Sequence, residues 1–298
     1  MKKILIIGST GLFGVNFISK LKNKYILICN EHKRKLNFHK NSVKINFFNK
    51  KDIKEKINFI KPDIILNCSG LTDLKKCEKN KKLAYRVNYL IIKNLCDVIK
   101  SSKIKLIHIS TDHLFNGNKE TYYNESDIKN PLNTYSLTKS LSEDEIKKKI
   151  QNYLIIRTNF FGWGTSYRNS ITDYIIKNLT LKKKVFLSNK IMFNPIYLGN
   201  LIDCVKVLIE RNQKGFFNLS TNHKISKFQF GKKIADIFNL DKNLIFERET
   251  NEVNKPKNMS LSIKKAKKIF EKKVFDLDQN IKNLKDDFEK KNIKEFYE

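Results

Sequence analysis

The chain has 298 residues, of which 40% are hydrophobic and 30% are charged, a length that suits one large domain or a domain with a smaller appendage. Its formal net charge of +30 comes almost entirely from lysines that are spread along the whole sequence. This pattern predicts a positive field that attracts anionic ligands such as nucleotides, and argues against a role in binding nucleic acid.

Neither a membrane segment nor a metal centre is expected. No apolar run reaches about 18 residues, and the apolar run at residues 4–7 is too short for a signal peptide. The five cysteines are scattered without a C-x-x-C pair, and the histidines lack metal-binding spacing. We therefore expect a cytoplasmic protein with no metal, no disulfide framework and no membrane partner.

The first predicted strand, residues 4–7, leads directly into a glycine-rich turn and a helix. In a dinucleotide site, Gly8 would allow the tight turn, Gly11 would let the backbone approach a pyrophosphate, and Gly14 would let the helix pack on the strand. The phosphates would lie at the helix N-terminus, where N–H groups lack helical partners. The order of strand, turn and helix therefore predicts a dinucleotide site.

The second predicted strand, residues 25–29, ends in the sequence NEHKRK. An acidic residue at this point is typical of NAD binding, whereas a basic cluster suits the 2′-phosphate of NADP. Arg34 and its basic neighbours His32, Lys33 and Lys35 favour NADP(H). Glu31 keeps NAD(H) open, as does the alternative that these are ordinary loop lysines.

Strands and helices then alternate, which predicts an α/β fold with a Rossmann-type doubly wound parallel sheet. The expected strands are residues 43–47, 64–67, 103–109 and 153–157, and the expected helices are 50–60, 78–99 and 134–150. Ligands lie at the carboxyl ends of such strands, where Gly11, Gly70 and Thr111 would converge.

Beyond residue 159 the pattern becomes irregular. We expect helices at 170–181, 198–211, 226–238 with Ser226 as N-cap, 262–270 and 278–290, and a strand at 215–219. We predict an NAD(P)-binding Rossmann domain at residues 1–160, to which residues 196–220 return. Residues 161–298 would form mainly a smaller C-terminal substrate-binding lobe.

A proton-transfer set follows from the segment 105–139. The buried strand ends in Ser110, Thr111 and Asp112, and Tyr135 and Lys139 lie four residues apart, on one face of a helix. The lysine charge favours tyrosinate and lowers the tyrosine pKa from its usual value of about 10. Such a tyrosine can give or take a proton while a cofactor moves a hydride.

These motifs together resemble the extended short-chain dehydrogenase/reductase superfamily, and within it the dTDP-4-dehydrorhamnose reductase-like group. The supporting stretches, besides the glycine turn, are KPDIILN (61–67), VN (87–88), STDHLFNG (110–117), PLNTYSLTK (131–139), RTNFFG (157–162) and KPKNMSL (255–261). The resemblance covers about residues 1–270 and is densest before residue 165.

The resemblance implies four catalytic roles. Tyr135 would be the general acid that protonates a 4-keto oxygen, and Lys139 would lower its pKa and hold the nicotinamide ribose. Thr111 would hydrogen-bond the same carbonyl. Asn88 matches the helix asparagine that positions a water near the lysine.

The resemblance also implies a cofactor site. Asn46 and Phe47 stand where the family often has Asp-Phe or Asp-Leu against the adenine, and Cys68, Ser69 and Gly70 match the small residues under the cofactor. The full set of implied cofactor contacts is Gly8, Thr10, Gly11, Leu12, Phe13, Gly14, Arg34, Asn46, Phe47, Cys68, Ser69, Gly70, Tyr135 and Lys139.

The departures from the family pattern lie at substrate positions. The residue at His113 is usually tyrosine and that at Phe160 usually tryptophan. His113 either contacts substrate or packs within its loop, and Trp163 either stacks on the sugar or covers the cleft. Asp112 either binds a sugar hydroxyl or caps the next turn. The candidate substrate contacts are Thr72, Thr111, Asp112, His113, Asn159, Phe160, Trp163 and Arg168.

The leading hypothesis is NAD(P)H-dependent reduction of the 4-keto group of a nucleotide-linked 6-deoxy sugar, with Arg168 near its diphosphate. One alternative is an epimerase or dehydratase of the same superfamily, although a dehydratase needs a carboxylate where this chain has His113. Another is a non-catalytic NADP-binding subunit, like the regulatory subunit of methionine adenosyltransferase. A homodimer is common in the superfamily.

Overall fold

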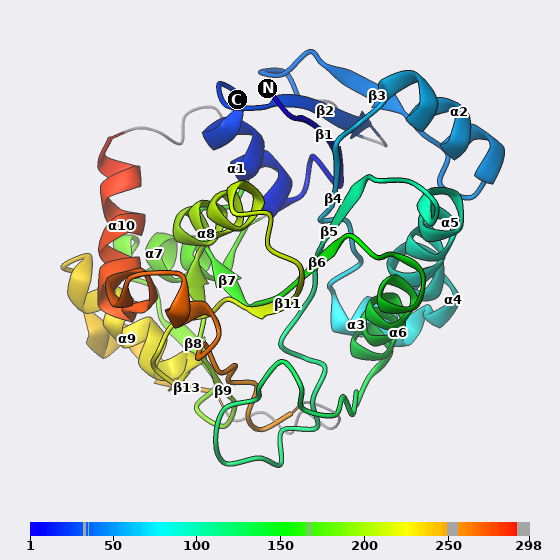
Figure 1. Ribbon diagram of the computed structural model, residues 1–298. Helices are drawn as coiled ribbons and strands as arrows, with labels where there is room; N and C mark the ends of the chain where they lie inside the picture. The colour runs from blue at the N-terminus through cyan, green and yellow to red at the C-terminus, as the bar shows by residue number, and fades with distance from the viewer. Residues whose placement is uncertain (32–33, 35, 166, 168, 249–255, 291–298) are drawn as a thin grey trace. The chain divides into compact units, whose positions relative to one another are not determined.

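The computed structural model describes residues 1–31, 34, 36–165, 167, 169–248 and 256–290. Its main sheet has seven strands in the order β11-β6-β5-β4-β1-β2-β3 (Figure 1). These strands are β1 (Lys3–Ile7), β2 (Ile26–Glu31), β3 (Ser42–Lys44), β4 (Ile64–Asn67), β5 (Lys105–Ile109), β6 (Tyr153–Arg157) and β11 (Gly215–Asn218). The strand order reverses between β1 and β4, and the pairs from β6 to β3 are parallel. This confirms the predicted Rossmann-type α/β class.

One face of this sheet is covered by α2 (Lys50–Ile60), α5 (Ile91–Ile99) and α6 (Thr134–Lys149), which lie together in Figure 1. Alternate strand residues point to this face because side chains of a strand alternate sides. Leu5, Ile65 and Leu106 therefore pack in one apolar cluster with residues of these helices. The same alternation determines which polar side chains of the strands face α6.

The chain divides into two compact units. Unit 1 comprises Met1–Leu114, Lys129–Ile156 and Gln213–Phe216, and unit 2 comprises Phe115–Ile128, Arg157–Asn212 and Phe217–Glu298. Residues 115–128 and 196–212 thus group with unit 2. The assignment of a cofactor-binding domain and a substrate-binding lobe to parts of the chain stays a prediction.

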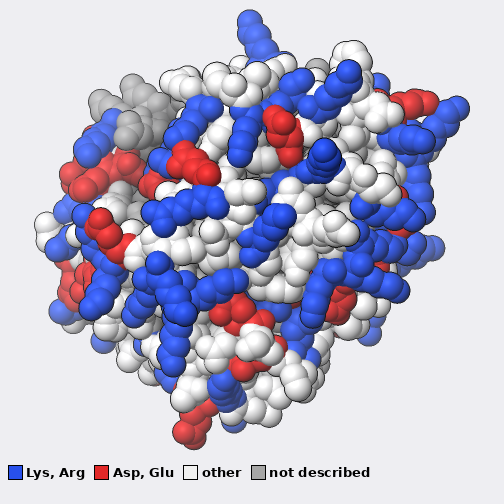
Figure 2. Space-filling model, viewed as in Figure 1, with Lys and Arg blue, Asp and Glu red and all other residues white. Residues whose placement is uncertain are grey.

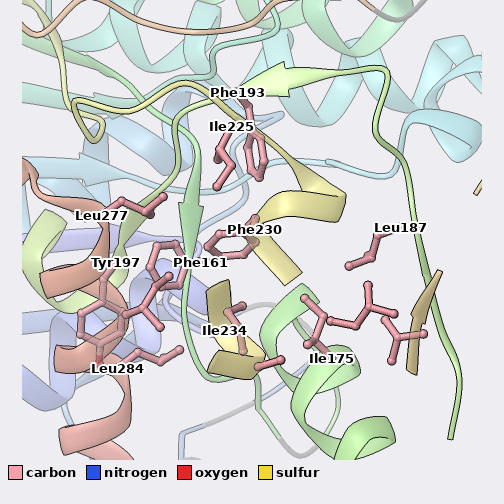
Figure 3. Packing of buried hydrophobic residues seen from close by; sticks show 14 of the residues in the cluster. Phe161, Ile175, Leu187, Phe193, Tyr197, Ile225, Phe230, Ile234, Leu277 and Leu284 are labelled. Atoms are coloured by element: carbon pink, nitrogen blue, oxygen red, sulfur yellow. The ribbon is translucent and has the colours of Figure 1, made fainter. Parts of the chain in front are cut away.

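In the part of unit 2 that the structure describes, short strands and four α-helices surround an aromatic core. The strands pair as β7 (Phe160–Phe161) with β10 (Ile196–Tyr197), β9 (Met192–Phe193) with β12 (Ile225–Ser226), and β8 (Val185–Leu187) with β13 (Ile245–Glu247). The helices are α7 (Ile171–Thr180), α8 (Leu198–Glu210), α9 (Lys227–Ile237) and α10 (Leu277–Glu289). In Figure 3, Phe230 of α9 lies beside Phe161. Phe193 and Ile225 lie beside each other in the same cluster.

Local signals predicted several elements well. The helix expected at 50–60 is α2, and Ser226 caps α9 in a reciprocal capping box with Gln229. The strand expected at 43–47 ends at Lys44, because the N–H of Ile45 donates to the side chain of Asn30 instead.

One long helix prediction is confirmed over most of its length but with an interruption, and one other helix prediction was wrong. The helix expected at 78–99 is divided into α3 (Leu74–Lys79), α4 (Lys81–Ala84), a π-helical segment (Tyr85–Leu90) and α5, and the side chain of Asn80 caps the start of α4. The helix expected at 262–270 is reduced to one 3₁₀ turn, Ala266–Lys268. Ser262 is bound on both sides by tertiary contacts, since its N–H donates to Tyr123 and its carbonyl accepts from Asn218.

The surface is strongly basic. On the face shown in Figure 2, lysine and arginine side chains are distributed widely, with acidic side chains among them. Among the described residues, no helix is both long enough and apolar enough to cross a membrane.

Candidate active site

The glycine turn has the geometry that a dinucleotide requires. Gly8 has a φ of +87°, and a Cβ there would lie 2.5 Å from the main-chain nitrogen of Ser69. A Cβ on Gly14 would lie 2.4 Å from the carbonyl oxygen of Gly8, so only glycine permits this approach of helix to strand. Helix α1 (Leu12–Leu21) starts at Gly11 with no side-chain cap and no acidic residue in its first turn. Its N-terminus therefore fits an anionic pyrophosphate.

Hydrogen bonds from side chains under the turn connect the ends of β1, β2 and β4. The thiol of Cys68 donates to the carbonyl oxygens of Ile7 at 3.2 Å and Gly8 at 3.4 Å. Burial raises the pKa of this thiol to about 12, so it stays protonated. The hydroxyl of Ser9 donates to the carbonyl of Asn30 at the end of β2. These bonds fix the floor on which a cofactor would lie.

The predicted adenine and 2′-phosphate contacts are in part described. Arg34 is exposed at the end of β2, whereas His32, Lys33 and Lys35 lie outside the described residues. Asn46 is exposed, and its side chain accepts from the N–H of Phe48. The side chain of Phe47 is buried in the core against α2 and α5, so a contact to adenine would come from its main chain.

Thr111, Asp112 and His113 form a compact polar cap after β5. The hydroxyl of Thr111 accepts from the N–H of His113 and donates to Asp112, both at 3.2 Å. The imidazole of His113 lies edge-on to the ring of Tyr135, with centroids 5.8 Å apart. The structure thus brings together these residues and Tyr135, which the sequence separates.

Tyr135 is held at the first turn of α6. Asn133 caps the helix in a reciprocal capping box with Ser136, and the N–H of Thr134 donates to the carboxylate of Glu78 at 2.6 Å. The buried ring of Tyr135 packs with Cys77. The cap holds the main chain of this turn, and the packing with Cys77 buries the ring.

The side-chain nitrogen of Lys139, one helical turn after Tyr135, is buried. It donates to the carbonyl of Ile109 at 2.7 Å and lies 3.0 Å from Nε2 of His108. Burial lowers the pKa of Lys139 to about 8, against the opposite effects of Glu143 and Cys68. A lysine with such a pKa can exchange its proton near neutral pH.

Asn88 braces the same helix from the π-helical segment. Its amide makes two hydrogen bonds with the main chain of Leu71, and its Nδ2 donates to the hydroxyl of Thr138 at 3.0 Å. The hydroxyl of Ser142 donates to the main-chain carbonyl of Asn88 at 2.6 Å. Asn88 therefore fixes the turn of α6 that carries Lys139, and π-helical segments often occur at functional sites.

Sequence reasoning missed three buried residues next to this set: Asn67, His108 and Glu143. The carboxylate of Glu143 accepts from the hydroxyl of Ser110 at 2.6 Å. The four-residue spacing that paired Tyr135 with Lys139 leads on to Glu143, so this residue could have been found from the sequence.

The predicted substrate residues of unit 2 have different surroundings. Trp163 is a core residue: its indole N–H donates to the carbonyl of Leu284 at 3.0 Å, and its ring stacks on Phe288. These contacts favour a structural role, and the sugar contact of Trp163 stays a prediction. Asn159 and Phe160 are partly buried, Thr72 in unit 1 is exposed, and Arg168 lies outside the described residues.

Among the described residues, no group of three histidine, cysteine or acidic side chains could hold a metal ion. The residues that unit 1 brings together suit proton transfer by Tyr135 and Lys139 beside an anion-binding turn.

Comparison with known proteins identifies the family. A family model described as RmlD substrate binding domain matches residues 1–290. The chain belongs to this family. It is thus a member of the dTDP-4-dehydrorhamnose reductase-like group of the extended short-chain dehydrogenase/reductases, as the sequence motifs indicated.

Three curated relatives extend over most of the chain. A spore coat polysaccharide biosynthesis protein of Bacillus subtilis is 26% identical over 240 residues, covering 79% of each chain. The dTDP-4-dehydrorhamnose reductase of Escherichia coli is 28% identical over 201 residues, 67% of this chain and 64% of the relative. Methionine adenosyltransferase 2 subunit beta of Xenopus laevis is 24% identical over 248 residues, 80% of this chain and 73% of the relative.

Solved structures share the fold. The dTDP-4-dehydrorhamnose reductase of Bacillus anthracis, in complex with NADP, has a TM-score of 0.85 at 23% identity, covering 96% of this chain and all of that one. The dTDP-glucose 4,6-dehydratase of the same organism, in complex with NAD, has a TM-score of 0.77 at 17% identity, covering 97% and 98%.

Proposed function

We propose that this protein reduces the 4-keto group of a nucleotide-linked 6-deoxy sugar with NADPH. The observation that carries the proposal is the placement of Thr111, His113 and Tyr135 together at the carboxyl end of β5, with Lys139 buried one helical turn further along α6. Family membership and the similarity to a dTDP-4-dehydrorhamnose reductase support this reaction class.

The residues of unit 1 would divide the chemistry among them. NADPH, when bound at the glycine turn, supplies the hydride. Tyr135 donates a proton to the carbonyl oxygen, and the hydroxyl of Thr111, turned away from Asp112, donates a hydrogen bond to the same oxygen. Lys139 holds the ribose and favours tyrosinate after the proton has left. Asn88 keeps the helical turn of Lys139 in place through Thr138.

NADP(H) is the proposed cofactor, with NAD(H) as the alternative. The basic cluster after β2, to which Arg34 belongs, suits a 2′-phosphate. An NADP complex of one structural relative supports this choice, whereas another relative binds NAD. We also keep as proposals the contacts of Thr72, Asp112, His113, Asn159 and Phe160 with substrate, a homodimer, and a cytoplasmic location.

The test is Tyr135→Phe, assayed by NADPH and NADH oxidation against a panel of 4-keto-6-deoxy sugar nucleotides. Loss of the general acid should lower turnover by about 10²–10⁴-fold, while NADPH binding, followed by cofactor fluorescence, is retained. Tyr85→Phe is the matched control, because Tyr85 is an exposed tyrosine of unit 1. Near-normal turnover of Tyr135→Phe would contradict the assignment.

The second candidate is a non-catalytic NADP-binding subunit. The similarity to a methionine adenosyltransferase subunit favours it, whereas the intact set of Thr111, Tyr135 and Lys139 favours the reductase. Co-purification with a partner enzyme, together with no NADPH oxidation by any substrate of the panel, would select this candidate. An epimerase or dehydratase would instead turn over sugar nucleotides without net oxidation of NADPH.

A further inference from the structure

A fully buried histidine lies beneath the proposed catalytic lysine. His108 of β5 is in register with Asn67 of β4, so both side chains project from the sheet on the same side. That side is the one on which α6 packs, since Ile65 and Leu106, two residues earlier in each strand, contribute to the core beneath it. His108 has no role in the proposed reduction, and its partners show what it can do.

A continuous chain of contacts leads from Asn67 to Lys139. Nδ2 of Asn67 lies 2.9 Å from Nδ1 of His108, and Nε2 of His108 lies 3.0 Å from the lysine Nζ. The orientation of the Asn67 amide is set by Ser69, whose main-chain N–H and hydroxyl both donate to its oxygen, at 3.3 and 2.7 Å. The NH₂ group of Asn67 therefore faces the imidazole.

This orientation determines which imidazole nitrogen carries the proton. Nδ1 of His108 accepts a hydrogen bond from Asn67, so a neutral ring carries its proton on Nε2. That N–H points at the amino group of Lys139. An ammonium group has only donors, whereas a neutral amine has a lone pair and can accept from Nε2–H while donating to the carbonyl of Ile109. The contacts are complementary only when the lysine is neutral.

The charged lysine requires the opposite arrangement. An ammonium group would donate to an unprotonated Nε2, which puts the ring proton on Nδ1, facing Asn67. The Asn67 amide would then have to turn its oxygen towards the ring and give up the bond from the N–H of Ser69. The two charge states of Lys139 thus correspond to two different hydrogen-bond patterns.

The surroundings of Lys139 give it a pKa at which both the ammonium and the neutral amine are accessible near neutral pH. Burial opposes the ammonium form, while Glu143 of α6 and Cys68 after β4 favour it, and the resulting pKa is about 8. Burial and the lysine hold the pKa of His108 well below its usual value, so the ring stays neutral. Glu143 is itself bound by Ser110 and lies 3.7 Å from Nζ of Lys129. Tyr135 is one helical turn before the lysine.

We propose that Asn67 and His108 form a tautomer switch beneath Lys139, which sets and reports the charge of the lysine. When the lysine becomes charged, Nδ1 gains a proton from solvent, Nε2 gives its proton to Nζ, and the Asn67 amide turns over. One proton is taken up in total and the ring remains neutral. His108 is thus a positioning residue, and its effect on turnover, though not the switch itself, rests on the proposed reductase function.

The direct test is nitrogen NMR of ¹⁵N-histidine-labelled protein between about pH 6 and pH 10, with His108 assigned by correlation to its own main chain. We expect a neutral ring throughout, protonated on Nδ1 at low pH and on Nε2 at high pH, with a midpoint near 8. In Lys139→Met the ring should keep one tautomer. A single tautomer across the range in the unaltered protein, an imidazolium form, or a transition that persists in Lys139→Met would overturn the proposal.

A second test uses turnover. In His108→Gln the side-chain oxygen can accept from the ammonium without a change of tautomer, so the alkaline limb of the kcat/KM profile should move up by about one pH unit. A merely structural role would lower kcat/KM equally at every pH and would overturn the proposal. The NMR transition needs no turnover, so its failure leaves the reductase assignment intact, and the failure of Tyr135→Phe leaves the switch intact.

Discussion

Asn67 of unit 1 and Asn194 of unit 2 are both buried, but their amide nitrogens have different kinds of partner. In unit 1, the amides of Asn67 and Asn88 bond to the side chains of His108 and Thr138, next to an ionisable lysine. In unit 2, the amide nitrogen of Asn194 donates only to main-chain carbonyls, those of Thr221 and Leu261. Main-chain partners have no protonation state and only fix loops, whereas ionisable partners change with pH. Asn67 therefore lies where it can influence chemistry, whereas Asn194 holds loops of unit 2 in place.

The two units also differ in the free-energy cost of the groups that they bury. Unit 1 buries Asp112, Lys139 and Glu143 at one strand end, and burying charges opposes folding. The core of unit 2 around Phe230 is apolar and aromatic. Buried groups that oppose folding tend to occur at functional sites. Substitutions in unit 2 should therefore mainly reduce stability, and substitutions at the polar cluster of unit 1 should mainly reduce activity.

The largest effect on stability is expected from Phe230→Ala. Phe230 is fully buried, with ring centroids 5.0 Å from Phe161 and 5.8 Å from Phe193. The cavity should lower the free energy of unfolding by about 3–5 kcal/mol. Urea unfolding followed by the fluorescence of Trp163 measures it.

The matched control is Phe186→Ala. Phe186 is 48% exposed, so its truncation should change the free energy of unfolding far less than that of Phe230. Equal losses in the two variants would contradict the description of the unit 2 core.

Lys139→Met in unit 1 is expected to raise the free energy of unfolding, by less than Phe230→Ala lowers it. Burial lowers the pKa of the folded lysine from 10.5 to about 8, so below pH 8 both folded and unfolded states bind the proton, and the buried charge costs stability. Between these pKa values only the unfolded state keeps the proton, and this cost disappears as pH rises. Lys139→Met should therefore be more stable than the unaltered protein by about 1–3 kcal/mol at pH 7.

The measurement is the difference in unfolding free energy between the two proteins from pH 7 to pH 10.5. The advantage of the variant should shrink as pH rises, while the proposed reductase activity should be lost at every pH. A variant that is less stable at pH 7 would show that the lysine contributes net stabilising interactions to unit 1.

The smallest effect is expected from Trp163→Phe. This change removes the indole N–H that donates to Leu284 and should cost about 1 kcal/mol of stability. Because the ring is a core residue, KM for a keto-sugar nucleotide should remain as in the unaltered protein. A large rise in KM without loss of stability would support Trp163 as a sugar contact.

Where local geometry is sufficient, the sequence alone determined the outcome. The glycine turn could be predicted because a φ of +87° and the close approach at Gly14 leave few other residues possible. The α/β class followed from strand and helix periodicity, and the helix face shared by Tyr135 and Lys139 followed from their spacing. The cap at Ser226 was equally local.

Only the tertiary structure decided the surroundings of Lys139 and Trp163. All five residues of β5 are buried, so no alternation of polar and apolar residues shows that His108 faces α6. Its bond to Asn67 joins residues 41 apart in sequence, and the bond of Trp163 to Leu284 joins residues 121 apart. Such partners are selected by how strands and helices pack, and a pattern of residue types along the chain does not contain that information.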